Sequence, residues 1–170
     1  MICGNLYFSK YALAAILAAA SLAATGETLS GRVVGVADGD TITVLDASDE
    51  QHKIRLAGID APEKSQPYGQ VAKQSLSELV YGQQADIETS KRDRYGRKIG
   101  KVRVGGTDAN LEQIRRGLAW HYKAYELEQP PLDRSTYAEA EIEARSASRG
   151  LWGDPAPVAP WEWRHNKAAK

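Results

Sequence analysis

The fold is decided by residues 31–63, GRVVGVADGDTITVLDASDEQHKIRLAGIDAPE. β-branched and other apolar residues recur in short runs at 32–36, 41–45 and 54–58, and in the second and third runs they alternate with polar ones. That two-residue period is typical of half-buried β-strands. The turn Asp38-Gly39-Asp40 and the polar stretch 46–51 separate the runs. The segment therefore predicts a meander of three antiparallel strands.

The rest of the domain predicts a helix, two strands and two more helices. Ala72, Leu76, Leu79 and Val80 form the apolar face of a helix ending at Gly82. Residues 85–89 and 98–104 read as strands, 108–117 as a short helix, and Pro130 to Leu151 as a longer one. Five strands with a helix after the third is the order of an OB-like β-barrel. We expect an α+β, mainly β fold: a five-stranded OB-like barrel with three helices.

The two ends of the chain differ from this domain. Lys10 precedes an apolar run over 11–24 with small residues near its end, which predicts a secretory signal peptide over residues 1–24. An uncleaved N-terminal anchor is the alternative, although the run is short for a membrane span. We expect a periplasmic or secreted protein, with the domain at 25–153 and a Pro/Trp-rich tail at 154–170. Cys3 is the only cysteine, so the mature chain would contain no disulfide.

Charge and histidine content restrict the function. The chain has 22 Lys and Arg residues and 22 Asp and Glu residues, so its formal net charge is zero. A net charge of zero argues against tight non-specific binding of nucleic acid but allows a local basic site. The three histidines, His52, His121 and His165, lack zinc-site spacing and are expected at the surface or in packing.

Three carboxylates fall where the predicted strands turn. If the second and third strands form a hairpin, Asp40, Asp60 and Glu63 lie at the same end of the sheet. Several carboxylate oxygens on loops suit a hard cation such as calcium. An ordinary Asp-Gly turn is the alternative explanation for Asp38 and Asp40.

Two arginines favour a functional site. Arg55 stands among apolar residues of the third strand, where a guanidinium requires a carboxylate or an anionic ligand. Arg97 begins a strand after the turn at Tyr95-Gly96. Because the planar guanidinium donates two parallel hydrogen bonds to phosphate oxygens, two such residues beside a metal site would clamp a phosphate.

The motifs together resemble those of the thermonuclease (staphylococcal nuclease) family. Asp38-Gly39-Asp40-Thr41, Arg55 and Ile59-Asp60-Ala61-Pro62-Glu63 resemble its first signature, and Asp93-Arg94-Tyr95-Gly96-Arg97 its second. Gly117-Leu118-Ala119 and Gly150-Leu151-Trp152 resemble later landmarks. The similarity covers about residues 31–152, and two spaced signatures in order are far more specific than one short motif.

The resemblance implies a role for each matching residue. Asp40 and Asp60 match calcium ligands, and Ala61 matches a position that contributes its backbone carbonyl, often a threonine in the family. Arg55, Glu63 and Arg97 match catalytic residues, with Glu63 polarising the attacking water and the arginines holding the phosphate. Whether Glu63 is a general base or only orients the water stays open. The family also places a stacking tyrosine at a position similar to Tyr125.

Two regions depart from the family pattern or add to it. The loop after Glu63 is short and carries only Lys64, where the best-known member has a longer, lysine-rich loop, and the strand near Arg103 is basic instead of aromatic. Residues 91–103 hold seven basic side chains, which reads as a track for the phosphate backbone or as a solvated hairpin. Arg94 and Tyr95 in this segment, with Tyr125, are the candidate substrate contacts. Tyr122 is expected only to pack.

These observations predict a calcium-dependent nuclease that hydrolyses phosphodiester bonds of DNA and RNA by water attack at phosphorus. The resemblance implies products with 3′-phosphate and 5′-hydroxyl ends. We expect a monomer whose partner is its nucleic-acid substrate. One alternative is a catalytically silent nucleic-acid-binding module on the same fold. Another is an exported interaction protein using its Trp-rich tail. For the tail itself the alternatives are docking on the barrel, binding a partner, or disorder, and we expect docking because two tryptophans are rarely left in water.

Overall fold

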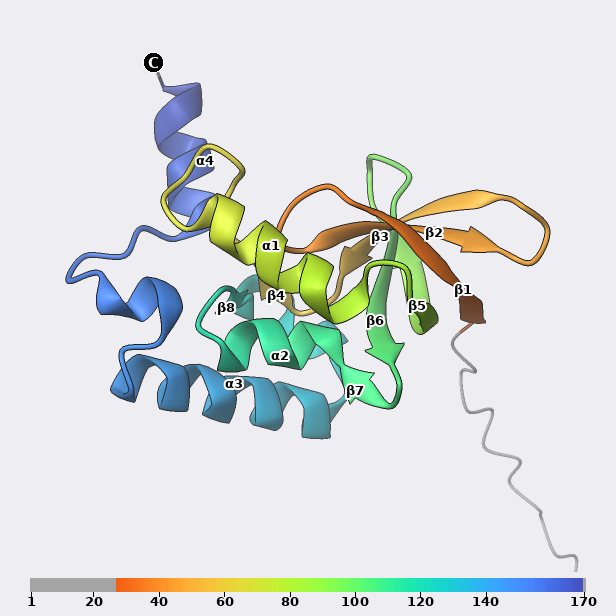
Figure 1. Cartoon of the computed structure of the whole chain (residues 1–170). Helices are drawn as coiled ribbons and strands as arrows, with labels where there is room; N and C mark the ends of the chain where they lie inside the picture. Colours follow the sequence, from red (N-terminus) through yellow and green to blue (C-terminus); the bar gives the residue numbers. More distant parts are fainter. Residues whose placement is uncertain (1–26, 170) are drawn as a thin grey trace, which may run out of the picture.

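The computed structural model describes residues 27–169, which form a closed barrel with helices packed along one side (Figure 1). The barrel strands are β1 (Glu27–Val36), β2 (Thr41–Asp46), β3 (Gln51–Leu56), β5 (Gln84–Arg92) and β6 (Lys98–Val104). They pair in the order β3-β2-β1-β5-β6, all antiparallel. A parallel pairing of β3 with β6 closes the ring, which confirms the predicted five-stranded OB-like barrel.

The third predicted strand is shorter than expected. It ends at Leu56 and not at Gly58, because Gly58 takes a left-handed backbone angle, φ 72°, that turns the chain. The chain then forms β4 (Ile59–Asp60), which pairs with β8 (Trp120–His121) outside the barrel sheet. This separate pairing places Asp60 beside the barrel end and not on its wall.

The described residues form four α-helices, which lie along one side of the barrel: α1 (Gly69–Val80), α2 (Ala109–Arg115), α3 (Pro131–Ser146) and α4 (Pro160–Ala168). Shorter elements are β7 (Thr107–Asp108) and the 3-10 turns η1 (Lys123–Glu128) and η2 (Gly150–Gly153). Asp108 caps α2 as predicted, since its carboxylate accepts a hydrogen bond of 3.1 Å from the backbone N–H of Leu111. Among residues 27–169, no helix is long and apolar enough to cross a membrane.

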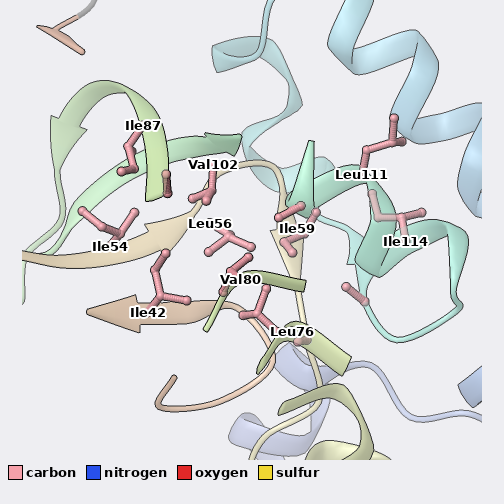
Figure 2. Close-up of a cluster of buried hydrophobic side chains, with 14 of the residues drawn as sticks. Ile42, Ile54, Leu56, Ile59, Leu76, Val80, Ile87, Val102, Leu111 and Ile114 are labelled. Carbon is pink, nitrogen blue, oxygen red and sulfur yellow. The ribbon is translucent and has the colours of Figure 1, made fainter. Parts of the chain in front are cut away.

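The core lies between the barrel and the first two helices. Side chains from β2, β3, β5 and β6 meet Leu76 and Val80 of α1 and Ile114 of α2 (Figure 2). Every one of these helix residues is fully buried. Burial of this kind contributes about 1.5–3 kcal/mol per large apolar side chain, so the core fixes the strand ends that carry the functional groups.

The end of the chain differs from the predicted plan in two places. The last predicted helix was expected to run to Leu151, but it ends at Ser146, because Ser148 has φ 51° and breaks the helical path. Leu151 then donates its N–H to the carbonyl of Gly117 at 2.8 Å, which joins the two later glycine motifs. The predicted tail contains α4, a helix that the sequence analysis did not foresee. The predicted signal peptide, 1–24, lies outside the described residues.

Candidate active site

The hairpin of β2 and β3 places Asp40 and Arg55 at one end of the barrel. Thr41 pairs with Arg55 across the hairpin, and Asp40 directly precedes that pair. The backbone N–H of Leu56 donates to the carbonyl of Asp40 at 2.8 Å, so the strand register itself sets their separation. This is the end of the sheet where the sequence analysis expected the carboxylates to meet.

Arg55 bridges the two predicted metal carboxylates. Its Nη1 lies 3.0 Å from Asp40 Oδ2, and its Nη2 lies 2.8 Å from Asp60 Oδ1. Nη1 also donates to the carbonyl of Ile59 at 3.0 Å. The side chain is only 15% exposed, so these partners, and not water, must compensate its positive charge. The expectation that Arg55 needs a carboxylate partner is confirmed.

Asp40 is a buried carboxyl group with a raised pKa. The pKa of Asp40 is raised to about 7. Burial is the largest cause, the Arg55 guanidinium opposes it, and the nearby carboxylates of Asp38 and Asp60 add to the rise. The N–H of Ala61 donates to Asp40 Oδ2 at 2.7 Å, and the Thr41 hydroxyl donates to Oδ1 at 3.1 Å. Two buried carboxylates side by side are most stable with cations beside them, and their oxygens suit a hard divalent cation. Asp40 and Asp60, with the carbonyl of Ala61, which follows Asp60 in the chain, are therefore a chemically suitable metal site.

Glu63 lies on the loop between β4 and α1. Gln66 accepts a hydrogen bond of 3.1 Å from the backbone N–H of Glu63, which fixes the loop locally. The loop closes tightly because Gly69 lacks a side chain: a Cβ there would lie 2.0 Å from the Glu63 carbonyl oxygen. The Glu63 side chain is 39% exposed, so its carboxylate is accessible to solvent.

Arg97 reaches the same end of the barrel from the turn between β5 and β6. Its Nε lies 2.7 Å from Asp93 Oδ2, and its Nη1 is 3.4 Å from the Thr41 hydroxyl, which in turn contacts Asp40. Partial burial raises the pKa of Asp93, but hydrogen bonds from Arg97 and from the backbone outweigh this and lower it. Asp93 therefore stays ionised and orients the Arg97 guanidinium.

The predicted substrate contacts lie on two neighbouring features. Tyr95 is exposed, and the guanidinium groups of Arg94 and Arg97 lie 4.9 and 5.5 Å from its ring centre. Tyr125, in η1, is half exposed and lies under the ammonium of Lys91 at 5.3 Å. Both side chains are at least half exposed to solvent, as a base-stacking residue requires.

Many basic side chains of the segment 91–103 are already paired with carboxylates of the protein. Lys91, Arg97, Lys101 and Arg103 each form an ion pair, with Glu128, Asp93, Asp133 and Glu88 respectively. Their charges are thus largely compensated within the protein. The attraction of this segment for a phosphate backbone is correspondingly weaker than its sequence predicts.

One residue at the site was missed by the sequence analysis. Arg164 of α4 contacts Glu63 Oε1 through Nη1 at 2.7 Å and Asp60 Oδ2 through Nη2 at 2.8 Å. Burial lowers the pKa of this guanidinium, but the hydrogen bonds that it donates to Asp60 and Glu63 raise the pKa above its ordinary value. No motif spacing joins residue 164 to residues 60 and 63, so only the docking of the tail brings them together. That docking was the expected fate of the Trp-rich tail and is confirmed.

A second acidic group lies at the other end of the β2–β3 hairpin. Asp46, Glu50 and His52 have ligand atoms within 4.8 Å of one another. His52 Nε2 is 2.7 Å from Asp46 Oδ2, so the pair satisfies itself. The remaining histidine of the barrel region, His121, is buried and bonds Gln129 at 2.8 Å, as expected for a packing residue.

Comparison with known proteins shows which family the chain belongs to. A sequence model described as "Staphylococcal nuclease homologue" matches residues 53–154. A protein of Escherichia coli O157:H7 named "Uncharacterized endonuclease" is 44% identical over 140 residues, which cover 82% of this chain and 87% of that protein. The chain belongs to the staphylococcal nuclease homologue family. A "Micrococcal nuclease" of Shigella flexneri is 41% identical over 143 residues, covering 79% of each chain. An "Uncharacterized endonuclease" of Haemophilus influenzae is 40% identical over 136 residues, 80% of this chain and 73% of that one.

Membership in the staphylococcal nuclease homologue family supports a nuclease acting on nucleic acid. The matched region contains Arg55, Asp60, Glu63 and Arg97, and it ends before α4. The contribution of Arg164 to the site is therefore outside what the family match describes.

Proposed function

We propose that this protein is a calcium-dependent endonuclease that hydrolyses phosphodiester bonds of DNA and RNA by water attack at phosphorus, leaving 3′-phosphate ends. One observation carries the proposal: Arg55 joins the buried carboxylates of Asp40 and Asp60 at the same barrel end where Glu63 is exposed. A guanidinium beside carboxylates that suit a metal ion and a solvent-exposed glutamate is the combination that phosphoryl transfer needs.

Asp40, Asp60 and the carbonyl of Ala61 would hold the calcium ion, which, when bound, supplies positive charge next to the reacting phosphate. Arg55 and Arg97 would donate hydrogen bonds to the phosphate oxygens, on which negative charge increases in the transition state. Glu63 would orient the attacking water, because its carboxylate is the exposed acceptor at the site. The buried network of Asp40, Arg55 and Asp60 keeps these groups in place before substrate binds.

The direct experiment is a digest of labelled single- and double-stranded DNA and RNA with calcium, magnesium or excess chelator, followed by analysis of the product ends. Cleavage with calcium, none with chelator, and 3′-phosphate ends are expected. Magnesium is expected to support less activity, because it requires tighter octahedral geometry. Full activity in excess chelator would contradict the metal assignment.

The second candidate, a silent nucleic-acid-binding module, is separated by the same digest. A protein that binds DNA in calcium without cutting any of the four substrates would favour it. Glu63→Gln is the matched variant, since it keeps size and hydrogen bonding but removes the negative charge. It is expected to bind substrate and to cleave far more slowly than the parent.

We further propose that the protein acts outside the cytoplasm, as the N-terminal apolar run suggests. N-terminal sequencing of the mature protein should return a start near Thr25 in the exported fraction. A soluble cytoplasmic protein beginning at Met1 or Ile2 would contradict export while leaving the catalytic proposal intact.

A further inference from the structure

Helix α4 is docked beside the site by aromatic contacts. Trp161 stacks on Tyr122, with ring centres 5.5 Å apart and planes 17° apart, and its edge meets Trp120 at 5.4 Å. Just before the helix, the carbonyl of Val158 accepts a hydrogen bond of 2.7 Å from Gln66. In Figure 1 the helix lies beside the loop that leads into α1, which is the loop of Glu63.

Trp161 and Arg164 share one face of α4, because residues three apart lie on the same side of a helix. With Trp161 packed on the aromatic cluster, Arg164 lies over Asp60 and Glu63. Its Nη1 is 2.7 Å from Glu63 Oε1 and 3.3 Å from Asp60 Oδ1, and its Nη2 is 2.8 Å from Asp60 Oδ2. The guanidinium thus connects the two carboxylates: Nη1 contacts both, and Nη2 contacts Asp60 alone.

Arg164 is the only partner of the Glu63 carboxylate among residues 27–169. The Glu63 backbone is held by Gln66, and Gln66 also bonds the segment before α4, so both parts of Glu63 depend on the tail. A half-exposed glutamate without a partner samples several rotamers, and fixing one of them costs free energy at the moment of reaction. The contact uses only Oε1, which leaves Oε2 for a water molecule.

The surroundings of Glu63 remain open on the far side of this contact. A cavity of about 530 Å³ is lined by Glu63, Lys64, Gln70, Trp163, Arg164 and Lys167. Glu63 therefore stays accessible to water while Arg164 is in place. The geometry is therefore that of a support for Glu63 and not of a cover over it.

We infer that Arg164, carried by the docked helix α4, is a positioning residue that holds the Glu63 carboxylate in its reactive orientation. The inference rests on the proposed nuclease function. Because Glu63 is held by Nη1 alone and Asp60 accepts from both nitrogens, the contact to Glu63 does not require the one from Nη2 to Asp60. The charge of Arg164 also offsets part of the negative charge of the buried Asp60.

The test compares Arg164→Ala, Arg164→Lys and the control Lys167→Ala in the full mature chain. Lys167 is on the same helix and lines the same cavity, but it makes no ion pair within the described part of the chain. Arg164→Ala should lower kcat on a labelled oligonucleotide by about tenfold to a hundredfold, the scale of removing a group that orients an active-site ligand, with a much smaller change in KM. Arg164→Lys should recover part of kcat, because it keeps the charge but not the planar fork. Lys167→Ala should retain the kcat of the parent.

A second readout does not use activity. In chelator, amide hydrogen exchange at 61–66 should become faster in Arg164→Ala than in Lys167→Ala, since the loop loses its tie to the tail. Melting temperatures of all variants, measured beside it, distinguish a local change from unfolding. If Arg164→Ala unfolds, the kcat and the amide hydrogen exchange of the folded Arg164→Lys variant decide whether Arg164 supports Glu63.

Three results would overturn the inference. Equal kcat and equal exchange in Arg164→Ala and the parent would show that Glu63 needs no support. A higher kcat, reached at a lower calcium concentration, would show that Arg164 competes with the metal and restrains the enzyme. A parent that binds DNA without cutting it would remove the proposed function and this inference with it, whereas a cutting parent with unaffected variants would remove the inference alone.

Discussion

The two sides of the candidate site are built in different ways. On the barrel side, Asp40 directly precedes β2 and Arg55 lies on the paired strand β3; both are mostly buried, and Arg55 bridges Asp40 and Asp60. On the tail side, Arg164 is 43% exposed and comes from a short helix that Trp161 packs against Tyr122 and Trp120. The barrel side is fixed by the core of the domain, but the tail side is held by a few peripheral contacts that can open without unfolding the barrel.

This difference separates two kinds of failure. A change on the barrel side should damage chemistry and stability together, because a buried charge loses its partner. A change on the tail side should damage chemistry and leave the barrel folded. The following predictions test that division, beginning with the largest effect.

Arg55→Lys should lower single-turnover cleavage by about a hundredfold or more, which is the cost of losing one preorganised donor to a developing charge. It should also lower the melting temperature, because a lysine cannot reach Asp40 and Asp60 with the same planar geometry. Stopped-flow or quench cleavage beside thermal melting measures both. Substrate affinity should change much less than the rate.

Arg97→Lys is the matched comparison for Arg55→Lys within the barrel. Its loss of turnover should be similar, but its melting temperature should stay near that of the parent, since Arg97 is more exposed and pairs with a turn residue. Cleavage within twofold of the parent in both folded variants would refute the phosphate clamp.

Trp161→Ala should reduce kcat by about tenfold, similar to Arg164→Ala, because it releases the helix that carries Arg164. The barrel should melt as in the parent, while exchange of the α4 amides becomes fast. The double variant Trp161→Ala/Arg164→Ala should be no slower than the slower single variant, since both remove the same support. Additive losses would mean that Trp161 acts on the site independently of Arg164.

Tyr125→Ala should weaken substrate binding by about 1 kcal/mol, roughly fivefold, with little change in kcat, because a half-exposed ring contributes the lower end of a stacking interaction. Affinity for single-stranded oligonucleotides measures the effect. Tyr81→Ala is the control, since Tyr81 is an exposed tyrosine at the end of α1. Equal losses in both variants would argue against a specific stacking role.

The smallest effect is expected for Asp46→Asn, far from the site. The hydrogen bond with His52, assisted by backbone N–H groups of Glu50 and Ser48, lowers the pKa of Asp46. A lowered folded pKa stabilises the protein above the ordinary aspartate range and loses that effect as pH falls through it. Asp46→Asn should therefore melt slightly earlier at neutral pH, with the difference vanishing in acid.

Calcium dependence of cleavage provides the control for that variant. It should be unchanged in Asp46→Asn, because Asp40 and Asp60 are the proposed ligands. A lost calcium response would instead assign the metal to the group of Asp46, Glu50 and His52.

Much of the barrel side follows from local sequence. Alternation in 41–45 and 54–58 predicts the hairpin, and the hairpin alone puts Asp40 next to Arg55. The break after Leu56 was not predicted, because a left-handed turn at Gly58 is one of several conformations open to glycine. The ion pairs that compensate the charge of the basic segment 91–103 could not be predicted either, since Lys101 and Arg103 pair with residues of other elements.

By itself, the sequence determined the strand order, the barrel, and the residue types at the proposed metal and phosphate positions, because periodicity and turn chemistry act over a few neighbouring residues. Only the tertiary structure decided that Arg164 meets Asp60 and Glu63, a hundred positions away in the chain. That meeting depends on the packing of Trp161 against Tyr122 and Trp120, and long-range packing of this kind leaves no local period in the sequence.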